Sequence, residues 1–166
     1  LGQLGMLEGT DYDIYTTHGP TSGVSNGLGS AGAHGANADQ LANYDTILYY
    51  SGNLSTFIMS DGSNTGLNDK GDDLGVMTQW KGLPGQRNVA YFGDNLYSGM
   101  ENDSAAGATY VSTQLSAVVT DADIRDDIDN QSAPTVRPID AAFTTEFVAY
   151  GGCVAINTFD NVAPTG

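Results

Sequence analysis

The sequence predicts an α/β domain in which a mainly parallel sheet is covered by helices on both faces. Segments at 12–17, 44–50 and 88–92 have the β-branched and aromatic content of strands. Segments at 72–81 and 104–116 carry apolar residues at helical spacing. Because strands that alternate with helices return in the same direction, this order is typical of a parallel sheet.

The segment before the first strand is predicted to be the last turns of a helix. Residues 1–8 place Leu4 and Leu7 on one helical face, and residues 9–11 then break the helix. A glycine-rich loop at 19–35 follows the strand at 12–17. Residues 37–43 are compatible with a short helix before the next strand.

The segment 44–50 is the clearest strand, since it is nearly continuously apolar after Asp45, as a strand covered on both faces must be. Asp72 and Asp73 open the following helix, where negative charge suits the positive end of the helix dipole. The predicted apolar face of that helix consists of Leu74, Met77 and Trp80.

Ser104 is the predicted cap of the helix that runs to about 116. Its predicted inward face consists of Ala108, Val111 and Leu115. Segments 146–150 and 154–156 predict later strands on either side of a Gly-Gly-Cys turn. The whole of 1–166 is therefore interpreted as a single α/β domain.

Charge restricts the classes of partner. The chain has 166 residues and a formal net charge of −15, from 20 acidic residues against five lysines and arginines. Five scattered cations do not form the basic footprint that nucleic acids require, and anionic membrane surfaces are disfavoured for the same reason. An acidic surface keeps a secreted or salt-tolerant protein soluble, and it attracts divalent cations.

Three segments together resemble a known family: YDIYTTHGPTSGVSNGLG, then ANYDTILYYSGN with its helix and RNVAYFGDNL, then FVAYGGCVAINTFD. They are similar to the flavodoxin-like domain of the class I glutamine amidotransferase-like superfamily, especially to divergent members inside long secreted bacterial proteins. The resemblance implies a three-layer parallel fold, an extracellular or cell-surface location and other domains of a longer parent chain as partners. In that family a further strand precedes the helix that begins this chain.

The absence of that first strand predicts a domain truncated relative to its parent, and the linker-like residues 163–166 suggest a second cut. An exposed sheet edge is then expected beside the strand at 12–17. Such an edge must be covered or paired, and another copy of the chain could do so.

The resemblance also implies that residues 93–97 correspond to the turn that carries the active-site nucleophile in the family. Catalytic members carry a cysteine nucleophile in a Gly-x-Cys-x-Gly turn after a central strand. Here Asn95 occupies the nucleophile position and Tyr97 replaces the closing glycine. Because an amide side chain cannot form the covalent intermediate, the sequence favours an accessory or ligand-binding domain with a degenerate elbow.

The segment DGSNTGLNDKGD at 61–72 matches the spacing of a calcium loop. An acid stands at loop positions 1 and 12, oxygen-bearing side chains at 3 and 5, and glycine at 6. The predicted metal ligands are Asp61, Ser63, Thr65, Leu67 (through its carbonyl) and Asp72. The competing interpretation is an ordinary Asx-turn loop that caps the next helix through Asp69 or Asp72.

The alternative function is a small hydrolase of esters, lactones or amides, with calcium ordering a loop or polarising a carbonyl. Its nucleophile would be Ser25, in a Gly-x-Ser-x-Gly sequence, or Cys153, assisted by His18 or His34. The Ser25 motif, however, does not follow a strand directly, as a nucleophile elbow requires. The competing interpretation of Cys153, His18 and His34 is a small buried cysteine and two loop histidines.

Overall fold

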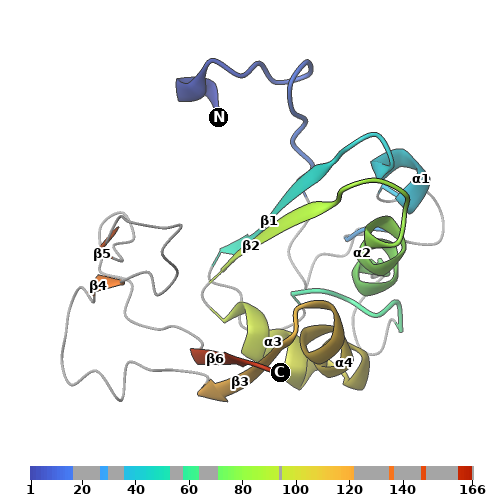
Figure 1. Ribbon diagram of the computed structural model, residues 1–166. Helices are drawn as coiled ribbons and strands as arrows, with labels where there is room; N and C mark the ends of the chain where they lie inside the picture. Colours follow the sequence, from blue (N-terminus) through green and yellow to red (C-terminus); the bar gives the residue numbers. More distant parts are fainter. Residues whose placement is uncertain are drawn as a thin grey trace.

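A computed structural model describes the chain over residues 1–16, 27–29, 36–52, 58–63, 71–93, 95–121, 135–136, 147–148 and 161–165 (Figure 1). In chain order, the helices and strands of these ranges are η1 (Gly2–Leu4), α1 (Ala38–Leu41), β1 (Thr46–Gly52), α2 (Asp73–Lys81), β2 (Asn88–Gly93), α3 (Leu96–Asp103), α4 (Ala105–Gln114), β3 (Ala117–Asp121), β4 (Thr135–Val136), β5 (Phe147–Val148) and β6 (Asn161–Pro164). Helices and strands are therefore mixed along the chain, as in an α/β protein.

Strands β1 and β2 form the parallel pair predicted for 44–50 and 88–92. Thr46 pairs with Asn88 and the register continues to Tyr50 opposite Phe92, with α2 in the crossover between the strands. The inward side chains pack against the buried core; they are Ile47, Tyr49, Val89 and Tyr91. The outward side chains Leu48, Tyr50 and Phe92 stay exposed, so the described residues do not provide the coverage on both faces that the apolar sequence predicts.

Helix α2 confirms the prediction for 72–81. The Asp72 carboxylate accepts a hydrogen bond from the Gly75 amide at 2.9 Å, which caps the first turn. Leu74, Met77 and Trp80 are buried as expected, with Met77 and Trp80 fully enclosed. The core lies between the inner face of β1–β2 and helices α2, α3 and α4.

Helix α4 begins after Ser104, whose hydroxyl accepts from the Gly107 amide at 3.0 Å. Of its predicted inward face only Val111 is fully buried, whereas Ala108 and Leu115 are half-buried. Gly107 lies so close to α3 that a Cβ there would come within 2.0 Å of the Met100 carbonyl oxygen. This approach turns the side of α4 that carries residues 107, 110 and 111 inward.

The predicted helix at 1–8 and strand at 12–17 were wrong over the described residues. Only a short 3-10 turn forms at 2–4, because Gly5 and Gly9 adopt positive φ (78° and 77°) and interrupt the helical pattern. In the second segment only Tyr12 is paired, in an isolated bridge to Glu8, and residue 17 lies outside the described ranges. Strand propensity alone does not hold a segment extended without a neighbouring strand.

The later part of the chain agrees only in part. The strand predicted at 146–150 appears as β5, two residues long and antiparallel to β4, while 154–156 lie outside the described residues. Helix α3 and the antiparallel pair β3–β6 were not predicted. Over the described ranges, no helix is both long and apolar enough to span a membrane.

Candidate functional site

The candidate site lies where the chain leaves the carboxyl ends of β1 and β2. Because these strands are parallel, both ends meet at one edge of the sheet, the edge at which open α/β sheets bind ligands. Segment 58–63, the start of α2 and Asn95 all follow these ends along the chain. These residues include three of the predicted metal ligands and the degenerate elbow.

Asp73 is the buried centre of this edge. It is 4% exposed, and its two carboxylate oxygens accept hydrogen bonds from the amides of Leu28 at 2.8 Å and Ser60 at 2.9 Å. Burial raises the pKa of Asp73 to about 6, although both hydrogen bonds act in the opposite direction. Gly27 packs so closely that a Cβ there would lie 2.8 Å from the carboxylate. Asp73 therefore fixes segments 27–29 and 58–60 against the start of α2.

Two tyrosines connect further segments to the same place. The Tyr49 hydroxyl, from β1, donates to the Ile58 carbonyl at 2.7 Å, and the Tyr15 hydroxyl donates to the Gly27 carbonyl at 3.2 Å. Burial raises the pKa of both phenols, and the nearby Asp73 carboxylate adds to the increase. Both hydroxyls therefore stay protonated and act as donors. Sequence reasoning did not identify this network.

The two ends of the predicted calcium loop lie together. The Asp61 carboxylate accepts from the Ser63 amide at 3.0 Å, and hydrogen bonds from Ser63 lower the pKa of Asp61. Gly62 has a φ of 77°, and a Cβ there would lie 3.2 Å from the Asp72 Cβ. Loop positions 1 to 3 are thus close to position 12. Thr65 and Leu67 lie outside the described residues.

The oxygen ligands among the described residues fit a calcium ion in part. Two carboxylates and the Ser63 hydroxyl are hard oxygen ligands. The Asp61 carboxylate, however, also accepts hydrogen bonds from the side chains of Ser63 and Ser104. Among the described residues, no three acidic, histidine or cysteine side chains gather closely enough to hold a metal. The remaining oxygens would have to come from Thr65, Leu67 or water. The same Asx-turn at Asp61 and helix cap at Asp72 are also what the competing interpretation predicts.

The elbow has the expected strand–turn–helix context but not the expected chemistry. Strand β2 ends at Gly93, and α3 begins at Leu96, so Asn95 is the residue before the helix. Its φ of −108° is ordinary backbone, not the strained geometry of a nucleophile elbow. Its side chain makes no capping hydrogen bond to the helix.

The four residues of the hydrolase alternative, His18, Ser25, His34 and Cys153, lie outside the described residues. Neither a nucleophile–histidine distance nor a surrounding pocket can be assigned to them. The hydrolase interpretation therefore stays a prediction.

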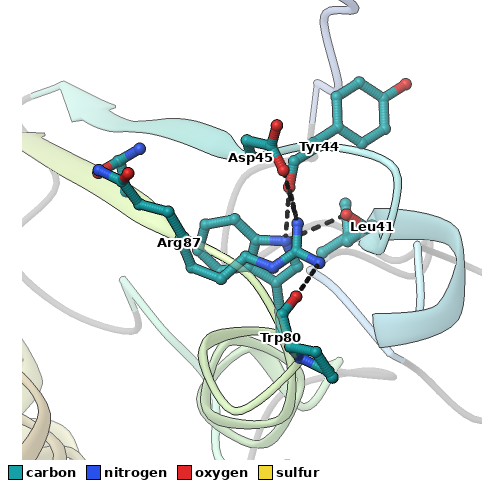
Figure 2. Close-up of polar contacts among 8 residues, drawn as sticks. Leu41, Tyr44, Asp45, Trp80 and Arg87 are labelled. Carbon is teal, nitrogen blue, oxygen red and sulfur yellow. Dashed lines mark hydrogen bonds and ion pairs between the residues drawn. The ribbon is translucent and has the colours of Figure 1, made fainter.

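A second polar cluster, not predicted, lies at the opposite edge of the sheet, where β1 and β2 begin (Figure 2). The Arg87 guanidinium lies 5.8 Å from the centre of the Trp80 ring. It donates to the Tyr44 carbonyl at 2.8 Å and the Pro84 carbonyl at 3.2 Å, and it pairs with the exposed Asp45 carboxylate at 3.1 Å. Its position at the amino-terminal edge, together with carbonyl partners, indicates a structural clamp.

Trp80 completes this clamp from the core side. Its indole N–H donates to the carbonyls of Leu41 and Tyr44, both at 3.1 Å (Figure 2). The end of α1, the start of β1 and the end of α2 are thereby joined. A buried tryptophan needs such an acceptor for its N–H.

Comparison with known proteins does not assign the candidate site. No protein-family model, no curated protein and no solved structure matches this chain. The chemistry of the site therefore has to be inferred from its own residues.

Proposed function

We propose that this chain is a non-catalytic binding module, an accessory α/β domain of a longer secreted bacterial protein, with calcium as a ligand of its 61–72 loop. The observation that carries the proposal is the elbow between β2 and α3. At the position where the resembled enzymes hold a nucleophile, the chain places an amide on unstrained backbone. Without a nucleophile the amidotransferase reaction has no covalent intermediate.

The three-layer flavodoxin-like arrangement is part of this proposal. Support comes from the parallel β1–β2 pair, from α2 in the crossover and from helices packed on one face. The net charge of −15 suits a domain exposed to the extracellular medium.

Calcium is favoured as the ligand because the ends of the loop converge. Gly62 brings Asp61 and Ser63 next to Asp72, and a cation at that point would neutralise two carboxylates in a strongly acidic chain. When bound, calcium would crosslink the start of the loop to the first turn of α2. The ion would then stabilise the folded state by mass action.

A melting experiment tests the calcium site. At a calcium concentration about a hundredfold above Kd, binding should add about 2.7 kcal/mol of stability. For a domain of this size that corresponds to a rise in Tm of about 5–10 °C over the chelated protein. Asp61→Asn should remove about half of this rise, because the neutral amide can still accept the Ser63 N–H but binds calcium about tenfold more weakly.

The exposed Asp39, in the first turn of α1, offers a matched control. Asp39→Asn removes the same charge at a distance in sequence from the loop, and should keep the full response to calcium. If the wild-type chain has the same Tm in calcium and in chelator, the calcium proposal is overturned. The Asx-turn interpretation of the loop then stands.

The non-catalytic claim has its own test. The wild-type chain should hydrolyse no activated ester, lactone or amide above background. If activity is found, and either Ser25→Ala or Cys153→Ala lowers turnover by roughly 10⁴-fold or more while the chain stays folded, the hydrolase alternative replaces the binding module. His18→Ala and His34→Ala would then identify the assisting base.

A further inference from the structure

The outward face of the β1–β2 pair is apolar, and the described part of the chain leaves it exposed. Leu48, Tyr50 and Phe92 each expose at least half of their surface, and Tyr50 exposes 78%. The register places Tyr50 directly opposite Phe92, so these side chains form one continuous patch. In a soluble protein a contiguous apolar patch on parallel strands indicates a surface that something else covers.

The chain also carries an unpacked apolar segment, residues 1–9, here named the N-terminal arm. Its leucines recur at every third position, at Leu1, Leu4 and Leu7, and Leu4 is 78% exposed. Figure 1 shows this segment (dark blue) leaving the rest of the molecule beside the sheet. Among the described residues, the hydrogen bonds of residues 1–12 join only residues of that same segment.

The root of the arm is fixed. Gly9 donates to the Tyr12 carbonyl at 2.8 Å, and the Asp11 carboxylate accepts from the Leu7 amide at 2.8 Å, which holds the turn between arm and body. The Tyr44 hydroxyl then donates to the Asp13 carboxylate. A turn held by these bonds lowers the conformational entropy lost when the arm docks on another molecule.

We propose that two copies of this chain exchange N-terminal arms, so that the leucines of each arm cover the Leu48, Tyr50 and Phe92 patch of the other copy. Both surfaces belong to the same chain, so reciprocal exchange forms a closed two-fold dimer and leaves neither surface exposed. The arm would then supply in trans the second cover of the sheet. This inference does not depend on calcium binding.

Electrostatics favours this contact over others between two copies. Each copy has a net charge of −15, yet the patch is uncharged and the arm carries a single acidic side chain, Glu8. Two copies can therefore approach through these surfaces without placing carboxylates face to face. Because the remaining repulsion is screened by salt, the dimer should become tighter as ionic strength rises.

Sedimentation velocity over a range of protein and salt concentrations tests the proposal. The wild-type chain should form a dimer, and Leu4→Asp or Tyr50→Asp should each weaken dimerisation by roughly tenfold or more. Both side chains are exposed, so neither substitution should lower Tm appreciably in the monomer. Gln3→Asp adds the same charge to the arm away from the leucines, and should leave the dimer largely intact.

Mixing the two weakened variants distinguishes exchange from other contacts. A heterodimer of Leu4→Asp and Tyr50→Asp keeps one intact arm on one intact patch, so the mixture should associate more strongly than either variant alone. A wild-type chain that stays monomeric at high salt overturns the proposal, and so does a dimer insensitive to Leu4→Asp. A mixture no stronger than its components, or a monomer whose arm protects its own β1–β2 amides from hydrogen exchange, would also overturn it.

Discussion

Replacing Arg87 by methionine should lower the free energy of unfolding by about 3 kcal/mol, because the guanidinium clamps three segments at the amino-terminal edge of the sheet. Hydrogen bonds from a charged donor contribute about 1.5–3 kcal/mol each, and those to Tyr44 and Pro84 are lost. The contact with the Trp80 ring adds about 1 kcal/mol. Methionine is chosen because its unbranched stem keeps most of the packing of the arginine chain.

Two effects limit the loss. The Nε of Arg87 is buried without a hydrogen-bond partner in the described structure, and removing it relieves a cost of about 1 kcal/mol or more. The Tyr44 carbonyl is not left unpaired, since it also accepts from the Trp80 indole. The expected loss of unfolding free energy is therefore about 3 kcal/mol. A simple sum of about 1.5–3 kcal/mol per hydrogen bond, with the ring contact added, would give about 5 kcal/mol.

The ion pair with Asp45 should contribute little. The Asp45 side chain is 84% exposed, and surface ion pairs typically contribute at most about 1 kcal/mol. Urea unfolding followed by the fluorescence of Trp80, the single tryptophan, measures Arg87→Met and Asp45→Asn side by side. Equal losses for the two variants, or a loss near zero for Arg87→Met, would refute the clamp.

Two further predictions concern the candidate site. Burial raises the pKa of Asp73 from 3.8 to about 6, so the folded state binds this proton more tightly than the unfolded state does. The protonation of Asp73 therefore stabilises the fold most below about pH 4, and this stabilisation is lost as the pH rises through about 6. Asp73→Asn should remove this part of the pH dependence in urea unfolding with chelator present, and parallel curves for variant and wild type would contradict the buried acid. Gly71→Ala should cost more than about 2 kcal/mol, since a Cβ there would lie 2.1 Å from the Leu28 carbonyl oxygen. Gly82→Ala, whose Cβ would meet no atom closer than 3.4 Å, is the control and should be nearly neutral in the same measurement.

The predictable part of the fold is the part with strong local signals. The run 44–50 and the capped helix at 72–81 were placed correctly because apolar periodicity and capping residues act over a few neighbouring positions. Helix α3 carries Gly99 and Asn102, which are poor helix formers, and it is held by burial of Leu96 and Met100 in the core. Such tertiary stabilisation leaves no local pattern to read.

Long-range pairing was likewise beyond sequence reasoning. Strands β3 and β6 join Ala117 to Pro164, and a segment that ends in Pro-Thr-Gly resembles a linker when its partner is unknown. In the opposite sense, Ile14 and Tyr15 have strand propensity but remain exposed outside any named strand. Propensity describes fit to a half-buried sheet surface, not an intrinsic preference of the backbone.

The candidate site likewise has features that a local motif predicts and features that only the fold creates. The spacing from Asp61 to Asp72 and the elbow at Asn95 could be found from sequence, because both are short motifs. Asp73 could not be distinguished from its neighbour Asp72, since both simply open a helix. Only the fold brings the amides of Leu28 and Ser60 to one carboxylate and buries it.

Isothermal titration with calcium tests the central claim, a calcium-binding module, most directly. The chelator-stripped wild-type chain should bind one calcium ion per chain, with a Kd on the order of 10⁻⁴–10⁻³ M, as is typical of extracellular modules. Asp61→Asn should weaken this binding by tenfold or so, a loss of about 1.4 kcal/mol. Asp39→Asn should leave it unchanged. Absence of saturable heat for the wild-type chain, together with the same Tm in calcium and in chelator, would contradict the account.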